Sequence, residues 1–175
     1  MNLKDTIRTI PDFPKPGIMF RDITTLMTNR AAFSETIKRL ADPYRDKGID
    51  NVAGIEARGF VFGAAVAYEL GAGYVPIRKK GKLPFDTYEQ EYELEYGTDV
   101  LELHADAVRG QEKVLLIDDL IATGGTAEAA IHLLRKAGSN VIGAAFVIDL
   151  PDLGGLAKIV DLGIPVTALV AYEGH

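Results

Sequence analysis

The chain has 175 residues, of which 47% are hydrophobic, and a formal net charge of −6. This length and apolar content fit one domain with a sizeable core, whereas the negative charge argues against general nucleic-acid binding, which requires an excess of Lys and Arg. The chain contains no Cys, which excludes disulfides, thiolate nucleophiles and Cys-based metal sites. No apolar run reaches the roughly 18 residues of a membrane span, and residues 1–5 lack the features of a signal peptide, so we expect a soluble, cytoplasmic protein without a membrane partner.

The N-terminal region, residues 1–30, begins with a predicted helix and continues into a proline-rich segment. Apolar residues at helical spacing predict the short helix: Leu3, Ile7 and Ile10. The helix ends in segment 11–17, where three prolines force an extended path. The following segment, 18–23, is too short and too mixed to assign from periodicity, and it would also fit an edge strand with Phe20 in the core.

A strand, loop and helix unit is predicted between residues 51 and 70, after a helix over 32–47. The strand covers 51–55, and the loop that follows reads Glu56-Ala57-Arg58-Gly59-Phe60. An arginine in such a loop is suited to phosphate binding. The alternative is a surface ion pair between Arg58 and Glu56, which would contribute little.

The next predicted strand, 74–77, leads into the cationic run Arg78-Lys79-Lys80-Gly81-Lys82. A charge run is usually a solvated surface, but its place directly after a strand of an acidic protein favours a role in neutralising phosphate. Residues 83–97 are polar and aromatic, and the alternation within 92–96 predicts a hairpin arm that could act as a lid. A strand over 100–104 follows the arm.

The most informative stretch, residues 114–126, passes from an apolar run to two acids and then to glycines. Its first four residues suit a strand buried on both faces of a parallel sheet. We expect this strand to end at Asp118 and Asp119, because the interior of a sheet cannot hold two carboxylates. The loop Ala122-Thr123-Gly124-Gly125-Thr126 then leads into a predicted helix over 127–137.

The chemistry of this loop predicts a site for one phosphate. Its glycines let backbone N–H groups turn inward, its threonines add hydroxyl donors, and the helix contributes the positive end of its dipole. Asp118 and Asp119 lie just upstream, where carboxylates can accept hydrogen bonds from sugar hydroxyls or act through a metal. The alternative is a glycine-rich turn with two solvated acids, but the complete order of strand, acids, loop and helix favours the ligand site.

The rest of the chain completes an alternating pattern, with strands over 141–148 and 165–170 and a short helical segment over 154–162. About five core strands alternate with helices, which predicts an α/β fold with a doubly wound, mainly parallel sheet. We expect one domain over residues 1–175.

The stretch Val-Leu-Leu-Ile-Asp-Asp-Leu-Ile-Ala-Thr-Gly-Gly-Thr resembles the phosphoribosyl diphosphate (PRPP) signature of the type I phosphoribosyltransferases, and its second half is similar to the adenine-specific branch. The resemblance implies a pentosyltransferase of purine salvage that transfers the 5-phosphoribosyl group of PRPP to N9 of adenine and releases AMP and pyrophosphate. It implies Mg²⁺ as cofactor, held mainly by PRPP without a direct protein ligand. It also implies a homodimer.

The same resemblance assigns roles to residues of this chain. Asp118 and Asp119 would hold the ribose hydroxyls, and the loop from Ala122 through Thr123, Gly124 and Gly125 to Thr126 would hold the 5-phosphate. The leaving diphosphate would be held by Arg58, Lys79 and Lys82.

The segment Phe-Pro-x-Pro-Gly-x-x-Phe-Arg-Asp-Ile is similar to the adenine pocket of that branch. Phe20 would stack on the purine, the Met19 backbone would pair with its polar edge, and Arg21 would organise the site. A backbone N–H facing N1 and a carbonyl facing the 6-amino group would accept adenine and mismatch a 6-oxopurine.

Glu-Tyr-Glu-Leu-Glu-Tyr-Gly resembles the family's flexible hood loop, here a lid over residues 79–100. Glu95, which would accept or relay the N9 proton, and Tyr96 would approach the reacting centre. The lid departs from the family at Phe85 and Asp86, where basic or small residues are common. On the residues alone, Glu95 also fits an outward-facing strand carboxylate.

Other classes fit less well. A nucleotide triphosphatase would need Gly-x4-Gly-Lys-Ser/Thr, and Gly81-Lys82-Leu83 fails that pattern. A dinucleotide-binding enzyme would need Gly-x-Gly-x-x-Gly, and segment 71–76 fails at the third glycine. The remaining alternatives are a 6-oxopurine or xanthine transferase and a PRPP-sensing regulator without catalysis.

Overall fold

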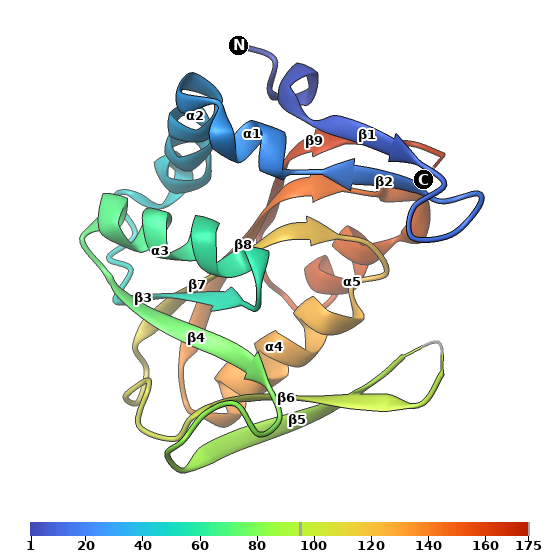
Figure 1. The fold of residues 1–175 in the computed structure, drawn as a ribbon. Helices are drawn as coiled ribbons and strands as arrows, with labels where there is room; N and C mark the ends of the chain where they lie inside the picture. Colours follow the sequence, from blue (N-terminus) through green and yellow to red (C-terminus); the bar gives the residue numbers. More distant parts are fainter. Residues whose placement is uncertain (95, 175) are drawn as a thin grey trace.

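The computed structural model describes residues 1–94 and 96–174, and its centre is a seven-stranded sheet of order β5-β6-β4-β3-β7-β8-β9 (Figure 1). The five strands from β4 to β9 in this order run parallel, and β6 and β5 extend the sheet in antiparallel pairing. The strands are β3 (Asn51–Ile55), β4 (Gly73–Lys79), β5 (Thr87–Glu93), β6 (Thr98–His104), β7 (Lys113–Ile121), β8 (Asn140–Asp149) and β9 (Val166–Ala171). This arrangement confirms the predicted α/β fold with five parallel core strands.

Helices cover both faces of the sheet, as expected for parallel strands joined by crossover connections (Figure 1). The α-helices are α1 (Thr24–Thr28), α2 (Arg30–Ala41), α3 (Arg58–Leu70), α4 (Gly125–Lys136) and α5 (Gly155–Val160), with short 3₁₀ turns at Leu3–Thr6, Asp42–Tyr44 and Pro151–Leu153. Alternate residues of β3 face opposite cores: Val52 packs with α2 and α3, and Ala53 packs with α4. None of the helices in the described part of the chain is long and apolar enough to cross a membrane.

β7 runs farther than its sequence predicts, because its two neighbours differ in length. Pairing with β3 stops at Ile117, whereas pairing with β8 continues to Ile121. The strand therefore does not end at Asp118 and Asp119. These carboxylates lie on an extension that has a hydrogen-bonded neighbour on one side only, which leaves room for them beside the shorter β3.

The hairpin arm predicted over residues 83–97 is present as β5 and the start of β6. Its strands pair from Thr87 opposite His104 to Glu93 opposite Thr98. The arm forms one edge of the seven-stranded sheet, and the end of β5 points to the same side of the molecule as the turn between β1 and β2 (Figure 1).

The N-terminal prediction was partly wrong. Only Leu3–Thr6 is helical, and the chain then forms β1 (Arg8–Pro11), which pairs in antiparallel fashion with β2 (Met19–Asp22) as a separate two-stranded sheet. Ile10 thus lies in a strand opposite Phe20. The helical spacing of Leu3, Ile7 and Ile10 covers too few residues to fix a helix, and strand pairing across the proline-rich turn determines the structure instead.

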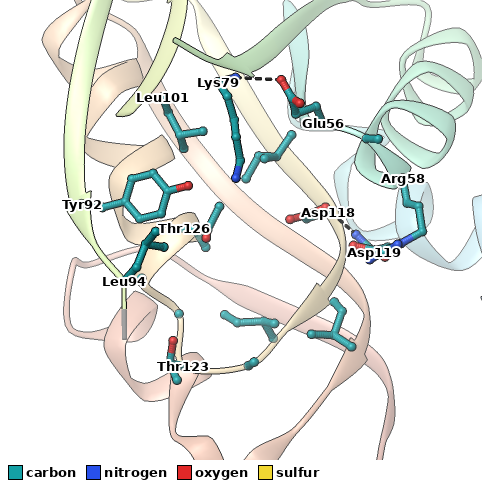
Figure 2. A pocket seen from close by; sticks show the side chains of 18 residues that line it. Glu56, Arg58, Lys79, Tyr92, Leu94, Leu101, Asp118, Asp119, Thr123 and Thr126 are labelled. Carbon is teal, nitrogen blue, oxygen red and sulfur yellow. Dashed lines mark hydrogen bonds and ion pairs between the residues drawn. The ribbon is translucent and has the colours of Figure 1, made fainter. Parts of the chain in front are cut away.

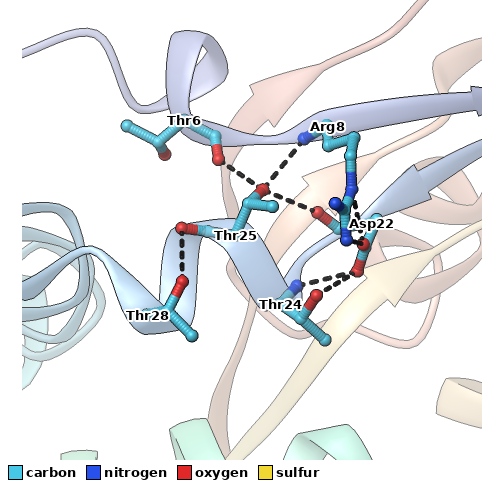
Figure 3. A network of polar contacts seen from close by, with 6 residues as sticks. All are labelled: Thr6, Arg8, Asp22, Thr24, Thr25 and Thr28. Atoms are coloured by element: carbon cyan, nitrogen blue, oxygen red, sulfur yellow. Dashed lines mark hydrogen bonds and ion pairs between the residues drawn. The ribbon is translucent and has the colours of Figure 1, made fainter.

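A polar network anchors this small sheet to the start of α1 (Figure 3). The buried carboxylate of Asp22 accepts hydrogen bonds from Arg8 Nε at 3.0 Å, from the Thr24 hydroxyl at 2.6 Å and from the Thr24 N–H at 3.0 Å. The Thr25 hydroxyl donates to the Thr6 carbonyl at 2.6 Å. The Thr24 hydroxyl, assisted by Arg8, lowers the pKa of Asp22 from 3.8 to about 2.

We expect Asp22→Asn to lower the free energy of unfolding at pH 7 by about 1–2 kcal/mol, because the amide cannot replace an ionised acceptor. The pKa of Asp22 is lower in the folded state than in the unfolded state, so its stabilisation is present above pH 3.8 and is lost as the pH falls toward about 2. Urea midpoints of the wild type and the variant should therefore converge over that interval. The exposed pair of Glu35 and Arg39 supplies a control, since Glu35→Gln should cost under about 0.5 kcal/mol. A constant difference between wild type and Asp22→Asn down to pH 2 would contradict the assignment.

Candidate active site

A cavity of about 330 Å³ lies at the carboxyl edge of the sheet, between the ends of β3, β4 and β7 and the lid hairpin (Figure 2). Ligands bind at this edge in open α/β sheets. The cavity brings together most of the residues that the sequence predicts for PRPP. These are Arg58, Lys79, Asp118, Asp119, Ala122, Thr123, Gly124, Gly125 and Thr126.

The loop after β7 forms the floor of the cavity and leads directly into α4. Gly124 has φ +88°, a left-handed conformation that favours glycine, and α4 begins at Gly125. The N-terminus of this twelve-residue helix therefore meets the cavity, where N–H groups and the helix dipole favour an anion.

Gly155, which sequence reasoning missed, supports this loop from behind. Its N–H donates to the Ala122 carbonyl at 3.1 Å, and a Cβ on Gly155 would lie 2.5 Å from that carbonyl oxygen. A Cβ on Gly124 would in turn lie 2.9 Å from the Gly155 Cα. The two backbones are thus in direct contact, and no signal within the loop motif itself could have identified the partner.

The two acids have different surroundings. Asp119 is 9% exposed and accepts a hydrogen bond from Arg58 Nε at 2.5 Å. The Asp118 carboxylate accepts the N–H of Asp119 at 2.8 Å and lies against Gly59, where a Cβ would be 2.6 Å from Asp118 Oδ1. Burial raises the pKa of Asp118 well above its usual range, and the neighbouring Asp119 adds to the effect.

Arg58 is the first residue of α3 rather than part of a free loop, and its partner is Asp119 and not Glu56. The Asp119 hydrogen bond raises the pKa of Arg58, with the Asp22 carboxylate among the smaller contributions. The guanidinium has five N–H donors, and Asp119 engages one through Nε. Arg58 therefore links the start of α3 to Asp119 within the cavity lining.

The cationic run 78–82, which begins at the end of β4, lies in two different environments. Lys79 lines the cavity, and its ammonium lies 2.8 Å from a carboxylate oxygen of Asp99. Lys82 instead pairs with Glu56, which also accepts the Lys79 N–H at 2.7 Å and lies 3.4 Å from Arg78 Nε. Among the described residues, Lys82 is outside the cavity lining.

The cavity has three further side chains that the sequence did not predict as site residues: Tyr92 and Leu94 of the lid, and Leu101 of β6. Tyr92 and Leu94 alternate on one face of β5 and its continuation, so the period-two pattern of the arm was the signal that could have found them. Tyr96 is 86% exposed. Glu95 lies outside the described residues, and its role stays a prediction, which the turnover rate of Glu95→Gln would test.

The predicted base-binding residues lie in β2, outside the lining of this cavity. Met19 is 41% exposed, and Phe20 is half-buried with its ring edge-to-face against Phe13 at a centroid distance of 5.1 Å. The Arg21 guanidinium donates to the Thr9 hydroxyl at 2.8 Å and lies 4.2 Å over the Tyr172 ring. Arg21 thereby joins the small sheet to the segment after β9.

These groups form one chemical arrangement. The loop before α4 offers N–H and hydroxyl donors for an anion, and Asp118 and Asp119 offer acceptors for hydroxyl groups. Arg58 adds positive charge beside Asp119, and the Lys79 side chain brings its ammonium into the cavity from the end of β4 (Figure 2). Such a site suits a phosphorylated sugar that carries a second anionic group.

Comparisons with known proteins agree with this arrangement. Residues 24–161 match the family described as Phosphoribosyl transferase domain. The chain is 60% identical to an adenine phosphoribosyltransferase of a Bradyrhizobium species, covering 100% of this chain and 98% of the relative.

Solved structures are also similar. A crystal structure of adenine phosphoribosyltransferase from Rhodothermus marinus has a TM-score of 0.91 and 48% identity, with 97% of this chain and 96% of that chain covered. The enzyme from Saccharomyces cerevisiae, complexed with D-2,5-dideoxy-2,5-imino-altritol 1,6-bisphosphate and adenine, has a TM-score of 0.89 and 38% identity, with 96% of each chain covered. The chain therefore belongs to the adenine phosphoribosyltransferases of the phosphoribosyl transferase family.

Proposed function

We propose that the chain transfers the 5-phosphoribosyl group of PRPP to N9 of adenine, giving AMP and pyrophosphate in purine salvage. The observation that carries this proposal is the single cavity that joins the loop before α4, the Asp118–Asp119 pair and the side chains of Arg58 and Lys79. PRPP carries a 5-phosphate, two ribose hydroxyls and a diphosphate, which match these three groups in chemistry.

The reaction develops charge that these residues can stabilise. Breaking the C1–O bond leaves positive charge on the ribose ring and negative charge on the departing diphosphate, while N9 forms a bond to C1 and loses its proton. Lys79 and Arg58 would stabilise the diphosphate. Asp118 and Asp119 would accept hydrogen bonds from the ribose hydroxyls, and Asp119 can do so in a fixed orientation because Arg58 holds it.

Mg²⁺ fits this donor set as an ion carried by the substrate. It prefers oxygen ligands and is commonly held by substrate phosphates with one or two carboxylates and waters. Three carboxylates line the cavity in the described part of the chain, Glu56, Asp118 and Asp119, and of these Glu56 is already paired with Lys82. When bound, Mg²⁺ would supply neutralising charge to the diphosphate, and the chain would contribute Lys79 and Arg58 beside it.

Base selection would take place at β2, with Phe20 stacked on the purine and the Met19 backbone on its polar edge.

The test of the proposed function is AMP formation from PRPP, Mg²⁺ and adenine by the purified protein, run in parallel with hypoxanthine, guanine and xanthine. Product with adenine alone is the expected result. Nucleotide from a 6-oxopurine would support the 6-oxopurine or xanthine transferase, and PRPP binding without product from any base would support a regulator.

Phe20→Ala should raise the KM for adenine by about tenfold and leave the KM for PRPP within about twofold, because loss of a stacking ring removes roughly 1–3 kcal/mol of base binding. Initial rates with each substrate varied in turn measure both constants. Tyr68→Ala is the control, since Tyr68 is an aromatic residue that is 89% exposed on α3. Equal increases in the two KM values would contradict a role specific to the base.

We further propose a cytoplasmic homodimer. The two-stranded sheet and its turn expose Phe13, Ile18 and Met19, which are 49%, 37% and 41% exposed and would suit an apolar interface. Analytical ultracentrifugation of the purified protein would test the dimer, and a monomer mass at micromolar concentration would refute it.

A further inference from the structure

The Lys79 ammonium is held in the cavity by a residue of the lid. Lys79 is the last residue of β4 and pairs across the sheet with Leu101 of β6. Asp99 lies two residues before Leu101, on the same face of β6, and its Oδ2 is 2.8 Å from Lys79 Nζ. This ion pair joins the end of β4 to the lid hairpin close to its turn, at the wall of the cavity.

The Asp99 carboxylate is itself fixed by the lid. Its Oδ1 accepts the Val100 N–H at 2.8 Å, and its Oδ2 is approached by the Tyr92 hydroxyl at 3.4 Å from the directly opposite position of β5. The hydrogen bond with Lys79 lowers the pKa of Asp99 and raises that of Lys79, so both groups are charged at neutral pH. Asp99 therefore presents one oriented oxygen to Lys79.

Tyr92 completes the arrangement over the cavity. In Figure 2 its hydroxyl and the Thr126 side chain of the phosphate loop face the end of Lys79. Burial raises the pKa of Tyr92, so the group stays a neutral hydroxyl that can donate a hydrogen bond. A lysine side chain is flexible, and an ammonium that is already oriented loses less conformational entropy when it binds an anion.

We propose that Asp99 and Tyr92 are positioning residues, which orient the Lys79 ammonium for the diphosphate of PRPP. The proposal rests on the proposed function, because it assigns the ligand of Lys79 to PRPP. An ammonium has three N–H donors, so Asp99 can keep one while the diphosphate takes another.

The residue after Lys79 offers a matched control for the effect of Asp99 on Lys79. Lys80 also pairs with the lid hairpin, since its Nζ lies 3.4 Å from Glu89 of β5. Both side chains are more exposed, at 62% and 51%, and neither belongs to the cavity lining. Glu89→Gln thus removes an ion pair between the turn after β4 and the lid hairpin without touching Lys79. This variant separates tethering of the lid from orientation of the ammonium.

The test compares steady-state kinetics and the affinity for Mg²⁺-pyrophosphate, measured by titration calorimetry. Asp99→Asn should raise the KM for PRPP and weaken pyrophosphate binding by about tenfold each, with the KM for adenine within about twofold. Tyr92→Phe should act in the same direction with a smaller effect. Asp99→Glu should recover most of the loss, because a carboxylate is retained, and Glu89→Gln should match the wild type.

A double-mutant cycle shows whether Asp99 acts through Lys79. In a Lys79→Met background, Asp99→Asn should cause no further loss of pyrophosphate affinity. A full additional loss in that background, an equal effect of Glu89→Gln, or unchanged or tighter binding in Asp99→Asn would each overturn the proposal. Failure of the wild type to form AMP would overturn the proposed function instead, and the pyrophosphate titrations would still decide the role of Asp99.

Discussion

Asp119→Asn should lower kcat/KM for PRPP by about 100- to 1,000-fold, which corresponds to roughly 3–4 kcal/mol and is comparable to the loss of one preorganised hydrogen-bonding group in an active site. Asp119 is 9% exposed and receives the Arg58 Nε–H at 2.5 Å. The amide keeps the shape of the side chain but loses its charge, so it accepts more weakly from both the guanidinium and a ribose hydroxyl. Arg58 also loses the group that orients it in the cavity wall.

Steady-state kinetics with PRPP varied at saturating adenine would measure this loss, and urea unfolding would show whether stability changes. Asp46→Asn is a suitable control, because Asp46 is an exposed acid before β3, at the opposite edge of the sheet. We expect wild-type kinetics for that variant. A decrease of less than tenfold in Asp119→Asn, with the fold intact, would show that Asp119 does not hold the substrate.

Much of the fold was predictable because local signals agreed with the tertiary structure. The apolar run before Asp118 is a central strand, flanked by β3 and β8 on its two sides, and the glycine loop does lead into α4. A buried parallel strand requires a continuous apolar run, and a phosphate loop requires glycines. Each feature can therefore be recognised from a sequence pattern only a few residues long. The cavity lining from Ala122 to Thr126 follows directly from that motif.

The remaining features depend on contacts between distant segments, which leave no local pattern. β7 continues past Asp118 only because β8 is longer than β3. Ile10 fits a helical spacing, yet it pairs with Phe20 across the turn between β1 and β2. In the sequence, Asp99 is one of several polar residues of the hairpin. Only the pairing of β4 with β6 places it beside Lys79.

Gly155 is the clearest case of such a contact, and Gly155→Ala should lower kcat/KM for PRPP by about 100-fold, the typical cost of a 1 Å displacement in an active site. The added Cβ would lie 2.5 Å from the Ala122 carbonyl oxygen and 3.0 Å from the Gly124 nitrogen, and both are backbone atoms of the phosphate loop. Because backbone cannot rotate away as a side chain does, the loop itself must move. Overpacking of this kind should also lower the free energy of unfolding by about 1–3 kcal/mol.

A Gly→Ala change elsewhere distinguishes this mechanism from a general effect of the substitution. Gly110→Ala introduces the same methyl group at a position with nothing within 4 Å and should leave both kinetics and stability near wild type. If the loop is displaced in Gly155→Ala, the KM for PRPP rises and the KM for adenine changes little, because β2 lies in a different sheet. Wild-type kinetics in Gly155→Ala would mean that the loop binds phosphate without support from α5. Equal loss of adenine and PRPP binding would indicate general misfolding rather than a displaced loop.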